Sequence, residues 1–159
     1  MAIHTLQRTQ IIAATIEECW SFFSNPKNLV RITPPTLDFV VKSELPGEIH
    51  EGLMIEYRVR PWLGIPVGWL TEITHVRKPG YFVDEQRVGP YAVWHHEHTF
   101  RELGEGQVEI GDLVHYVLPF GLLGEVLHPL VVKRQLAHIF DYRIRALQEI
   151  FPRNRGTVS

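Results

Sequence analysis

The spacing of hydrophobic and polar positions changes twice along the chain and divides it into three stretches. Residues 3–13 have an extended pattern, and Thr15-Ile-Glu-Glu18 then has the form of a capping box, with its threonine as the N-cap of a helix. Apolar residues follow at helical spacing as far as Asn25-Pro26, and residues 27–32 leave room for one more helical turn. The first stretch therefore predicts one strand followed by two short helices.

The middle stretch, from Leu37 to Leu118, consists of short extended runs separated by turns that contain Gly or Pro. This alternation is typical of strands and hairpins, and connections so short indicate an antiparallel meander. The predicted strands cover residues 37–45, 52–60, 67–77, 81–88, 91–102 and 107–118.

After Gly121 the apolar positions recur at helical spacing to the end of the chain. They predict a long amphipathic helix over about residues 130–151, with Pro129 at a kink or in the first turn and residues 122–128 as a separate turn or short helix. We expect a single domain over residues 1–152 and a disordered tail over residues 153–159. The stripe expected to face the core contains Leu130, Leu136, Ala137, Ile139, Phe140, Ile144, Leu147, Ile150 and Phe151.

Together these stretches predict an α+β layer architecture, in which a curved antiparallel sheet of about seven strands packs on one long helix. A sheet cannot close completely around a single helix. An apolar space is therefore expected between the two, and this space is the default ligand site.

The predicted strand that begins at Tyr91 carries the most informative side chains. Alternation places Trp94, His96, His98 and Phe100 on one face of this strand. The other face is more polar, so the face with the two histidines is expected to point inward. Two histidines among large aromatic residues indicate the wall of a pocket rather than an ordinary core.

The turns on either side of this strand predict which residues lie opposite one another. One tight hairpin is expected at Gly89-Pro90 and the next around residues 104–106, so that each histidine lies beside a carboxylate. A register error of one residue would dismantle the arrangement. The predicted opposite pairs are Asp84 with His96, Phe82 with His98, Gln86 with Trp94, His98 with Asp112, and Trp94 with Tyr116.

Three interpretations of this wall compete. The first is a buried polar network, in which the carboxylates orient the imidazoles and no bond is made or broken. The second is general acid–base catalysis, because a neighbouring Asp holds a His in one tautomer with a pKa near neutral. The third is a metal site, because His-x-His on a strand projects both rings to one side with carboxylates nearby. The first is preferred, since neither histidine belongs to a nucleophile or cofactor motif.

Other aromatic residues are weaker candidates. Trp62 and Trp69, with Leu63 and Ile65, either line the mouth of the pocket or belong to the core, and the area that Trp buries favours the core. Tyr57 is placed on a solvated strand, although it could also point inward.

Composition narrows the class of protein. Of the 159 residues, 45% are hydrophobic and 21% charged, with 16 Lys and Arg against 18 Asp and Glu, so neither disorder nor a strongly charged partner such as nucleic acid is indicated. The single cysteine, Cys19, cannot form an intrachain disulfide and is expected to be buried and inert, which favours a reducing, cytoplasmic setting. Neither a secretion signal nor a membrane span is predicted.

The order of elements and several short motifs resemble the START/Bet v 1-like superfamily, also called the SRPBCC or polyketide cyclase superfamily, and within it the bacterial ligand-binding proteins. The resemblance covers about residues 3–151 and implies a helix-grip fold without a metal or other cofactor. The motifs that carry it are Trp20-Ser-Phe-Phe-Ser24, Ile32-Thr-Pro34, Phe82-Val-Asp-Glu-Gln86, Gly89-Pro-Tyr91, Trp94-x-His96-x-His98-x-Phe100 and Asp112-x-Val-x-Tyr116-x-x-Pro119.

The expected function is the binding of an apolar or amphipathic small molecule, lipid-, polyketide- or isoprenoid-like, between sheet and helix. One alternative is a cyclase or dehydratase in which His96 or His98 abstracts a proton, with Asp84, Asp112 and Tyr116 as further candidates. A second alternative, implied by the resemblance only, is a non-catalytic module that works with a short-chain dehydrogenase-like partner. The residues expected to contact the ligand are Trp69, Phe82, Asp84, Gln86, Trp94, His96, His98, Phe100, Asp112, Tyr116, Phe140 and Ile144.

Overall fold

The fold is a single antiparallel sheet with helices against one face. The computed structural model describes residues 2–61, 64–104, 106–119, 121 and 131–152. Its seven-stranded sheet has the order β1-β7-β6-β5-β4-β3-β2, which confirms the predicted α+β architecture. The strands are β1 (His4–Ala13), β2 (Val40–Val41), β3 (Met54–Val59), β4 (Val67–Arg77), β5 (Tyr81–Val88), β6 (Val93–Gly104) and β7 (Gln107–Val117).

Both short helices after the first strand are present, and side chains cap each of them. The helix α1 (Ile16–Phe23) begins with the predicted capping box: the Glu18 amide donates to Thr15 Oγ1 at 3.2 Å, and the Thr15 amide donates to Glu18 Oε2 at 3.0 Å. The next helix, η1 (Pro26–Ile32), is a 3-10 helix, and the Asn25 side chain accepts from the Lys27 amide at its start.

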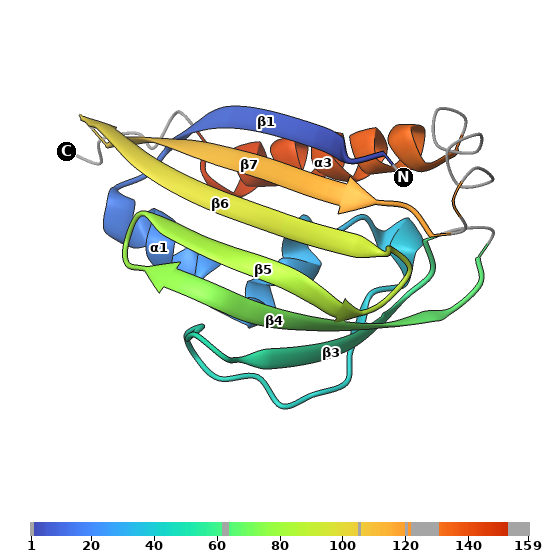
Figure 1. The fold of residues 1–159 in the computed structure, drawn as a ribbon. Helices are drawn as coiled ribbons and strands as arrows, with labels where there is room; N and C mark the ends of the chain where they lie inside the picture. Colours follow the sequence, from blue (N-terminus) through green and yellow to red (C-terminus); the bar gives the residue numbers. More distant parts are fainter. Residues whose placement is uncertain (1, 62–63, 105, 120, 122–130, 153–159) are drawn as a thin grey trace.

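The C-terminal helix α3 (Lys133–Ile150) lies on the same face of the sheet as α1 and η1 (Figure 1). It buries Leu136, Phe140 and Leu147, as the apolar stripe predicted. Gln10 Nε2 of the edge strand β1 donates to the Ile144 carbonyl at 2.9 Å and ties the two elements together. The expected turn over residues 122–128, Pro129 and Leu130 lie outside the described residues, as does the expected tail over 153–159.

The core under the helices is strongly aromatic. At the end near α1, Trp20 makes edge contacts with Phe82 and Phe100, at ring-centroid distances of 6.3 and 6.1 Å. Cys19 is fully buried there, and burial raises the pKa of its thiol to about 12. The thiol therefore has little thiolate character, in agreement with the inert role predicted from the sequence.

The strand predicted over residues 37–45 is wrong for most of its length, because a different local structure replaces it. A short 3-10 helix, η2 (Pro35–Leu37), leads into Asp38, which adopts a left-handed conformation with φ of 44°. The Asp38 carboxylate binds Arg58 at 3.0 Å and Arg60 at 2.8 Å, and these ion pairs hold the turn. Only the two residues of β2 then pair with β3.

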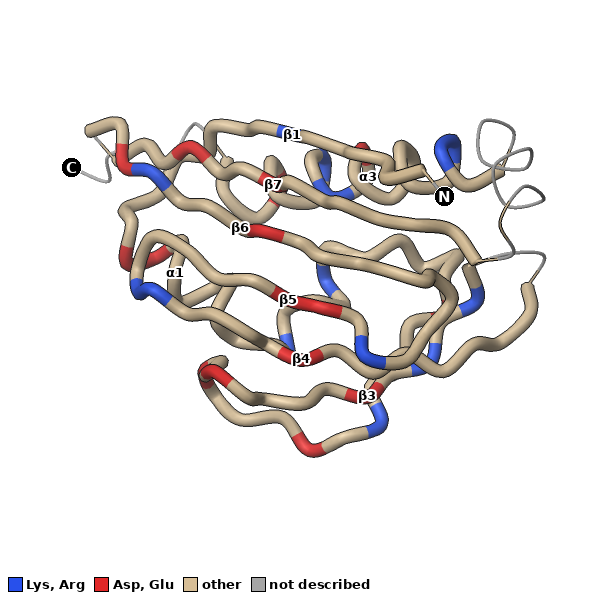
Figure 2. Tube along the Cα trace, in the orientation of Figure 1, with Lys and Arg blue, Asp and Glu red and all other residues tan. Residues whose placement is uncertain are grey.

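The charged residues do not gather on one element. Figure 2 shows Lys and Arg interspersed with Asp and Glu along the strands, in line with the balanced composition. Within the part of the chain that the structure describes, no helix is both long enough and apolar enough to cross a membrane.

The packing of α3 on the sheet predicts a large effect of truncating its stripe. Leu147 is 1% exposed, so Leu147→Ala should lower the free energy of unfolding by about 2–5 kcal/mol. The neighbouring Gln148 is exposed, and Gln148→Ala should change it by less than about 0.5 kcal/mol. Urea unfolding followed by circular dichroism measures both. Similar small losses in the two variants would contradict the burial of this stripe against the sheet.

Candidate functional site

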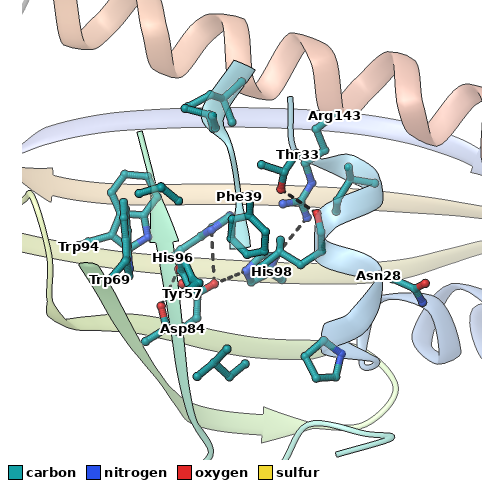
Figure 3. A pocket seen from close by; sticks show the side chains of 18 of the residues that line it. Asn28, Thr33, Phe39, Tyr57, Trp69, Asp84, Trp94, His96, His98 and Arg143 are labelled. Carbon is teal, nitrogen blue, oxygen red and sulfur yellow. Dashed lines mark hydrogen bonds and ion pairs between the residues drawn. The ribbon is translucent and has the colours of Figure 1, made fainter. Parts of the chain in front are cut away.

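A cavity of about 200 Å³ lies between the sheet and the helices. Most of its lining is apolar, and its charged and imidazole side chains gather on the wall formed by β5, β6 and α3, whereas Asn28 and Thr33 lie elsewhere on the lining (Figure 3). Lining residues come from η1 and the segment after it (Leu29, Ile32, Phe39), from the sheet (Tyr57, Trp69, Thr71, Ile73, Phe82, Asp84, Trp94, His96, His98) and from α3 (Leu136, Ile139, Phe140, Arg143).

Four of the five predicted opposite pairs are present; the fifth, Gln86 with Trp94, is not, because the pairing of β5 with β6 ends at Glu85 and His95. Across β5 and β6, Asp84 lies opposite His96 and Phe82 opposite His98. Across β6 and β7, His98 lies opposite Asp112 and Trp94 opposite Tyr116. Alternation then turns both histidines toward the helices, and each is 5% exposed.

The hydrogen bonds, however, run diagonally across the strands rather than between directly opposite residues. His96 Nε2 lies 2.9 Å from Asp112 Oδ1, and His98 Nε2 lies 2.6 Å from Asp84 Oδ2. The directly opposite contacts are longer, 3.5 Å from His96 Nδ1 to Asp84 Oδ2 and 3.4 Å from His98 Nδ1 to Asp112 Oδ1. Every ring nitrogen of the two histidines therefore lies within 3.5 Å of a carboxylate oxygen.

Arg143 of α3 completes the cluster. Its Nη2 lies 3.1 Å from Asp112 Oδ1 and 3.3 Å from His98 Nδ1, and the side chain is 8% exposed. Sequence reasoning missed this residue, although its spacing gave a signal: Arg143 follows Phe140 by three residues and precedes Leu147 by four, which places it on the apolar stripe. A charged residue within such a stripe indicates a buried partner.

Ring stacking fixes the orientation of the imidazoles. Phe82 stacks on His98 with a centroid distance of 4.0 Å and an interplanar angle of 16°, and His98 packs on His96 at 3.8 Å. Phe140 of α3 contacts the His96 ring edge to face at 5.6 Å. The two rings therefore have little freedom to turn away from the carboxylates.

The charges of the cluster shift its pKa values in different directions. Burial raises the pKa of Asp112, but Arg143 and the two histidines outweigh it and hold that pKa well below its usual value. Asp84 shows the same balance, and its pKa is also lowered. Burial lowers the pKa of His96, with a further contribution from the charge of His98. For His98, hydrogen bonds to Asp112 and Asp84 outweigh burial and raise the pKa.

Seven of the twelve expected ligand-contacting residues line the cavity: Trp69, Phe82, Asp84, Trp94, His96, His98 and Phe140. The other five do not. Asp112 accepts hydrogen bonds behind the histidines, and Gln86 bonds through its amide to both backbone groups of Tyr91. Phe100 packs against Trp20 and Phe23 in the core, Tyr116 packs between Trp94 and His4, and Ile144 lies at the edge where α3 meets β1.

The structure decides between the alternatives that the sequence left open for two aromatic residues. Tyr57 points into the cavity rather than toward solvent; its hydroxyl lies 2.8 Å from Thr71 Oγ1, and burial raises its pKa. Trp69, for which the sequence allowed the cavity or the core, stacks on Tyr57 at 5.8 Å and lines the cavity. Ile65 is 59% exposed, and Trp62 and Leu63 lie outside the described residues.

No protein-family model matches the chain, and no curated protein sequence matches it. Solved structures do match it over nearly its whole length. A START superfamily protein from Mycobacterium smegmatis has a TM-score of 0.70 at 13% identity, covering 93% of this chain and 97% of that chain. A protein from Thermus thermophilus has a TM-score of 0.65 at 20% identity, covering 92% of this chain and 95% of that chain.

Norcoclaurine synthase from Thalictrum flavum, in complex with dopamine and hydroxybenzaldehyde, has a TM-score of 0.63 at 14% identity, covering 93% of this chain and 88% of that chain. At such low identities the likeness concerns the fold. The chain has the helix-grip fold of START/Bet v 1-like proteins, as the resemblance in sequence implied. Proteins with this fold commonly bind hydrophobic ligands.

The opposite pKa shifts of the two histidines predict that they titrate on opposite sides of the unperturbed value near 6.5. In protein treated with a chelator to remove any bound metal ion, the ring nitrogens of His98 should titrate above pH 6.5 and those of His96 below it. Long-range ¹H–¹⁵N NMR spectra measure both, with His96→Gln and His98→Gln for assignment. The contribution of His98 to stability is then complete below about pH 6.5 and declines as the pH rises through its raised pKa. The reverse order of titration would contradict the described contacts.

Proposed function

We propose that the protein binds an apolar or amphipathic small molecule in the cavity, with the polar end of the ligand toward the cluster of Asp84, His96, His98 and Arg143. The observation that carries this proposal is a cavity with a mostly apolar lining and one wall that holds its charged and imidazole side chains. At about 200 Å³ it exceeds the roughly 150 Å³ that accept benzene and is smaller than the ~300 Å³ typical of drug-sized sites. A ligand of one or two rings fits this volume best.

Apolar burial alone gives such a ligand modest affinity. Each 100 Å² of apolar surface removed from water contributes about 2.5 kcal/mol, so a ligand that buries roughly 200 Å² gains about 5 kcal/mol. Micromolar binding needs about 8 kcal/mol. For micromolar affinity, the missing part of the binding free energy must come from polar contacts, which the charged and imidazole side chains of the polar wall can supply.

Two buried donors of lining residues, one on β4 and one on α3, support a ligand with a hydrogen-bond acceptor. Trp69 Nε1 and Arg143 Nε belong to lining residues, and neither finds an acceptor among the described residues. A buried donor without an acceptor costs about 1–3 kcal/mol. Both nitrogens lie just beneath the surface of the cavity, so a carbonyl or carboxylate oxygen on the ligand would remove this cost at either atom once the neighbouring side chains shift to admit it.

The cyclase or dehydratase alternative draws support from the fold of norcoclaurine synthase and from the imidazoles at the cavity. A general base, however, needs a ring nitrogen directed at the substrate. All four ring nitrogens lie within 3.5 Å of Asp84 or Asp112, and Tyr116 does not line the cavity. Binding is therefore the better supported function. The expected short-chain dehydrogenase-like partner finds no support in these structures and is not part of the proposal.

A fluorescent apolar probe should report on binding to the cavity. Trp94 is 8% exposed and lines the cavity, so Trp94→Ala should weaken probe binding by about 1–3 kcal/mol. Val93 precedes it on β6, faces the opposite side of the sheet and is 48% exposed, which makes Val93→Ala the matched control with unchanged affinity. Fluorescence titration measures both. Equal affinities of the two variants, or no binding by the wild type, would contradict the proposal.

Binding and catalysis can be separated once the natural ligand is known. Native mass spectrometry of protein purified from its own host identifies a co-purifying molecule, and we expect the wild type to leave this molecule unchanged on prolonged incubation. If the histidines were catalytic, His96→Asn or His98→Asn would lower turnover by a hundredfold or more and leave affinity within about tenfold. Conversion by the wild type that either variant abolishes would therefore establish the enzyme instead.

A further inference from the structure

Asp84, His96 and His98 bring three metal-binding groups together at the cavity wall. One ligand atom from each lies within 4.8 Å of the other two. Asp84 Oδ2 lies 2.6 Å from His98 Nε2 and 3.5 Å from His96 Nδ1. Ligands bound at about 2.0–2.1 Å to one transition-metal ion are roughly 3.0–3.4 Å apart. The three groups could therefore enclose an ion after shifts of less than about an ångström.

The second nitrogen of each histidine contacts another carboxylate. His96 Nε2 lies 2.9 Å from Asp112 Oδ1, and His98 Nδ1 lies 3.4 Å from the same oxygen. Histidines that bind a metal almost always donate their other ring N–H to a carboxylate, a carbonyl or a water, which fixes the tautomer and the direction of the ring. Asp112 Oδ1 takes this supporting position for His96 at 2.9 Å, whereas His98 Nδ1 is shared between Asp112 Oδ1 at 3.4 Å and Arg143 Nη2 at 3.3 Å. His96 Nδ1 and His98 Nε2 are left directed at Asp84.

The charges of the cluster also favour a cation. Asp84 and Asp112 carry two negative charges, and Arg143 supplies one positive charge through its contact with Asp112 at 3.1 Å. The two carboxylates and the guanidinium together leave one negative charge, on Asp84, at the wall of the cavity, and a divalent ion bound there would neutralise it.

We propose that Asp84 Oδ2, His96 Nδ1 and His98 Nε2 form a binding site for a divalent first-row transition-metal ion, with its open coordination positions toward the cavity. Two imidazoles and one carboxylate suit zinc, cobalt, iron or nickel better than calcium or magnesium, which prefer oxygen ligands. The site goes beyond the proposed binding function and departs from the expectation that the protein holds no metal. It does not depend on an organic ligand, because all three groups come from the chain itself.

The test uses the full chain, stripped with a chelator and titrated with Co²⁺. We expect one Co²⁺ per chain with visible absorption bands typical of nitrogen and oxygen ligands, and competition with a chromogenic chelator gives the affinity for Zn²⁺. Asp84→Asn and His98→Gln should each weaken binding at least tenfold. His95→Gln is the matched control, because His95 also lies on β6 and contacts Glu85 at 2.8 Å and Glu97 at 3.4 Å, but on the other face of the sheet. Its affinity should equal that of the wild type.

A measurement on the wild type keeps the test independent of variants that fail to fold. Bound Co²⁺ is paramagnetic and should broaden or shift the ring signals of His96 and His98 much more strongly than those of His95. The proposal would be overturned if the wild type bound no stoichiometric Co²⁺. It would also be overturned if the His95 signals were the more strongly affected, or if His95→Gln abolished binding and Asp84→Asn left it intact, since the ion would then lie on the outer face of the sheet.

Discussion

The ion pair between Asp112 and Arg143 is the constraint on which the rest of the site depends. Both side chains are 8% exposed, one on β7 and the other on α3. Burial of an unpaired charge costs several kcal/mol, and removal of one partner of a buried pair typically costs about 3–5 kcal/mol. The guanidinium and the carboxylate must therefore meet, and this requirement sets the position of α3 along the sheet. The same contact leaves Asp112 ionised and able to accept from both histidines.

A chain of side-chain contacts runs from this ion pair to the surface of the cavity. Asp112 orients His96 and His98, the Phe82 and Phe140 rings hold the imidazoles in place, and the imidazoles in turn contact Asp84. Of the described residues that line the cavity, Asp84 is the one that is acidic. The buried Asp112 carboxylate thus determines how His96, His98 and Asp84 are presented to a ligand in the cavity. Because the surroundings are apolar, each of these interactions is stronger than it would be in water.

The parts of this arrangement that the sequence predicts are those governed by local rules. Short connections set the register of β5, β6 and β7, so the pairs that bring the histidines beside Asp84 and Asp112 follow from residue numbers. The capping box at Thr15 likewise marks the start of α1. Contacts that depend on packing between distant segments do not follow. Arg143 meets Asp112 only once α3 is docked, and the diagonal hydrogen bonds depend on how the rings stack. The strand expected over 37–45 was wrong because the 3-10 helix η2 and the left-handed turn at Asp38 occupy its first residues, where Asp38 meets Arg58 and Arg60 from a distant part of the chain.

The lining of the cavity places donors and an acceptor at different points, and this restricts the chemistry of a ligand. Trp69 Nε1 and Arg143 Nε are donors that need an acceptor, whereas the Asp84 carboxylate repels an acceptor that approaches it directly. A ligand that meets all three requires both kinds of group, for example a carbonyl and a hydroxyl on one or two rings. A cation between Asp84 and the histidines reverses the requirement at Asp84, because the ion attracts the oxygen that the carboxylate alone would exclude. Metal content would therefore change which ligands the cavity accepts, and not only how tightly it binds them.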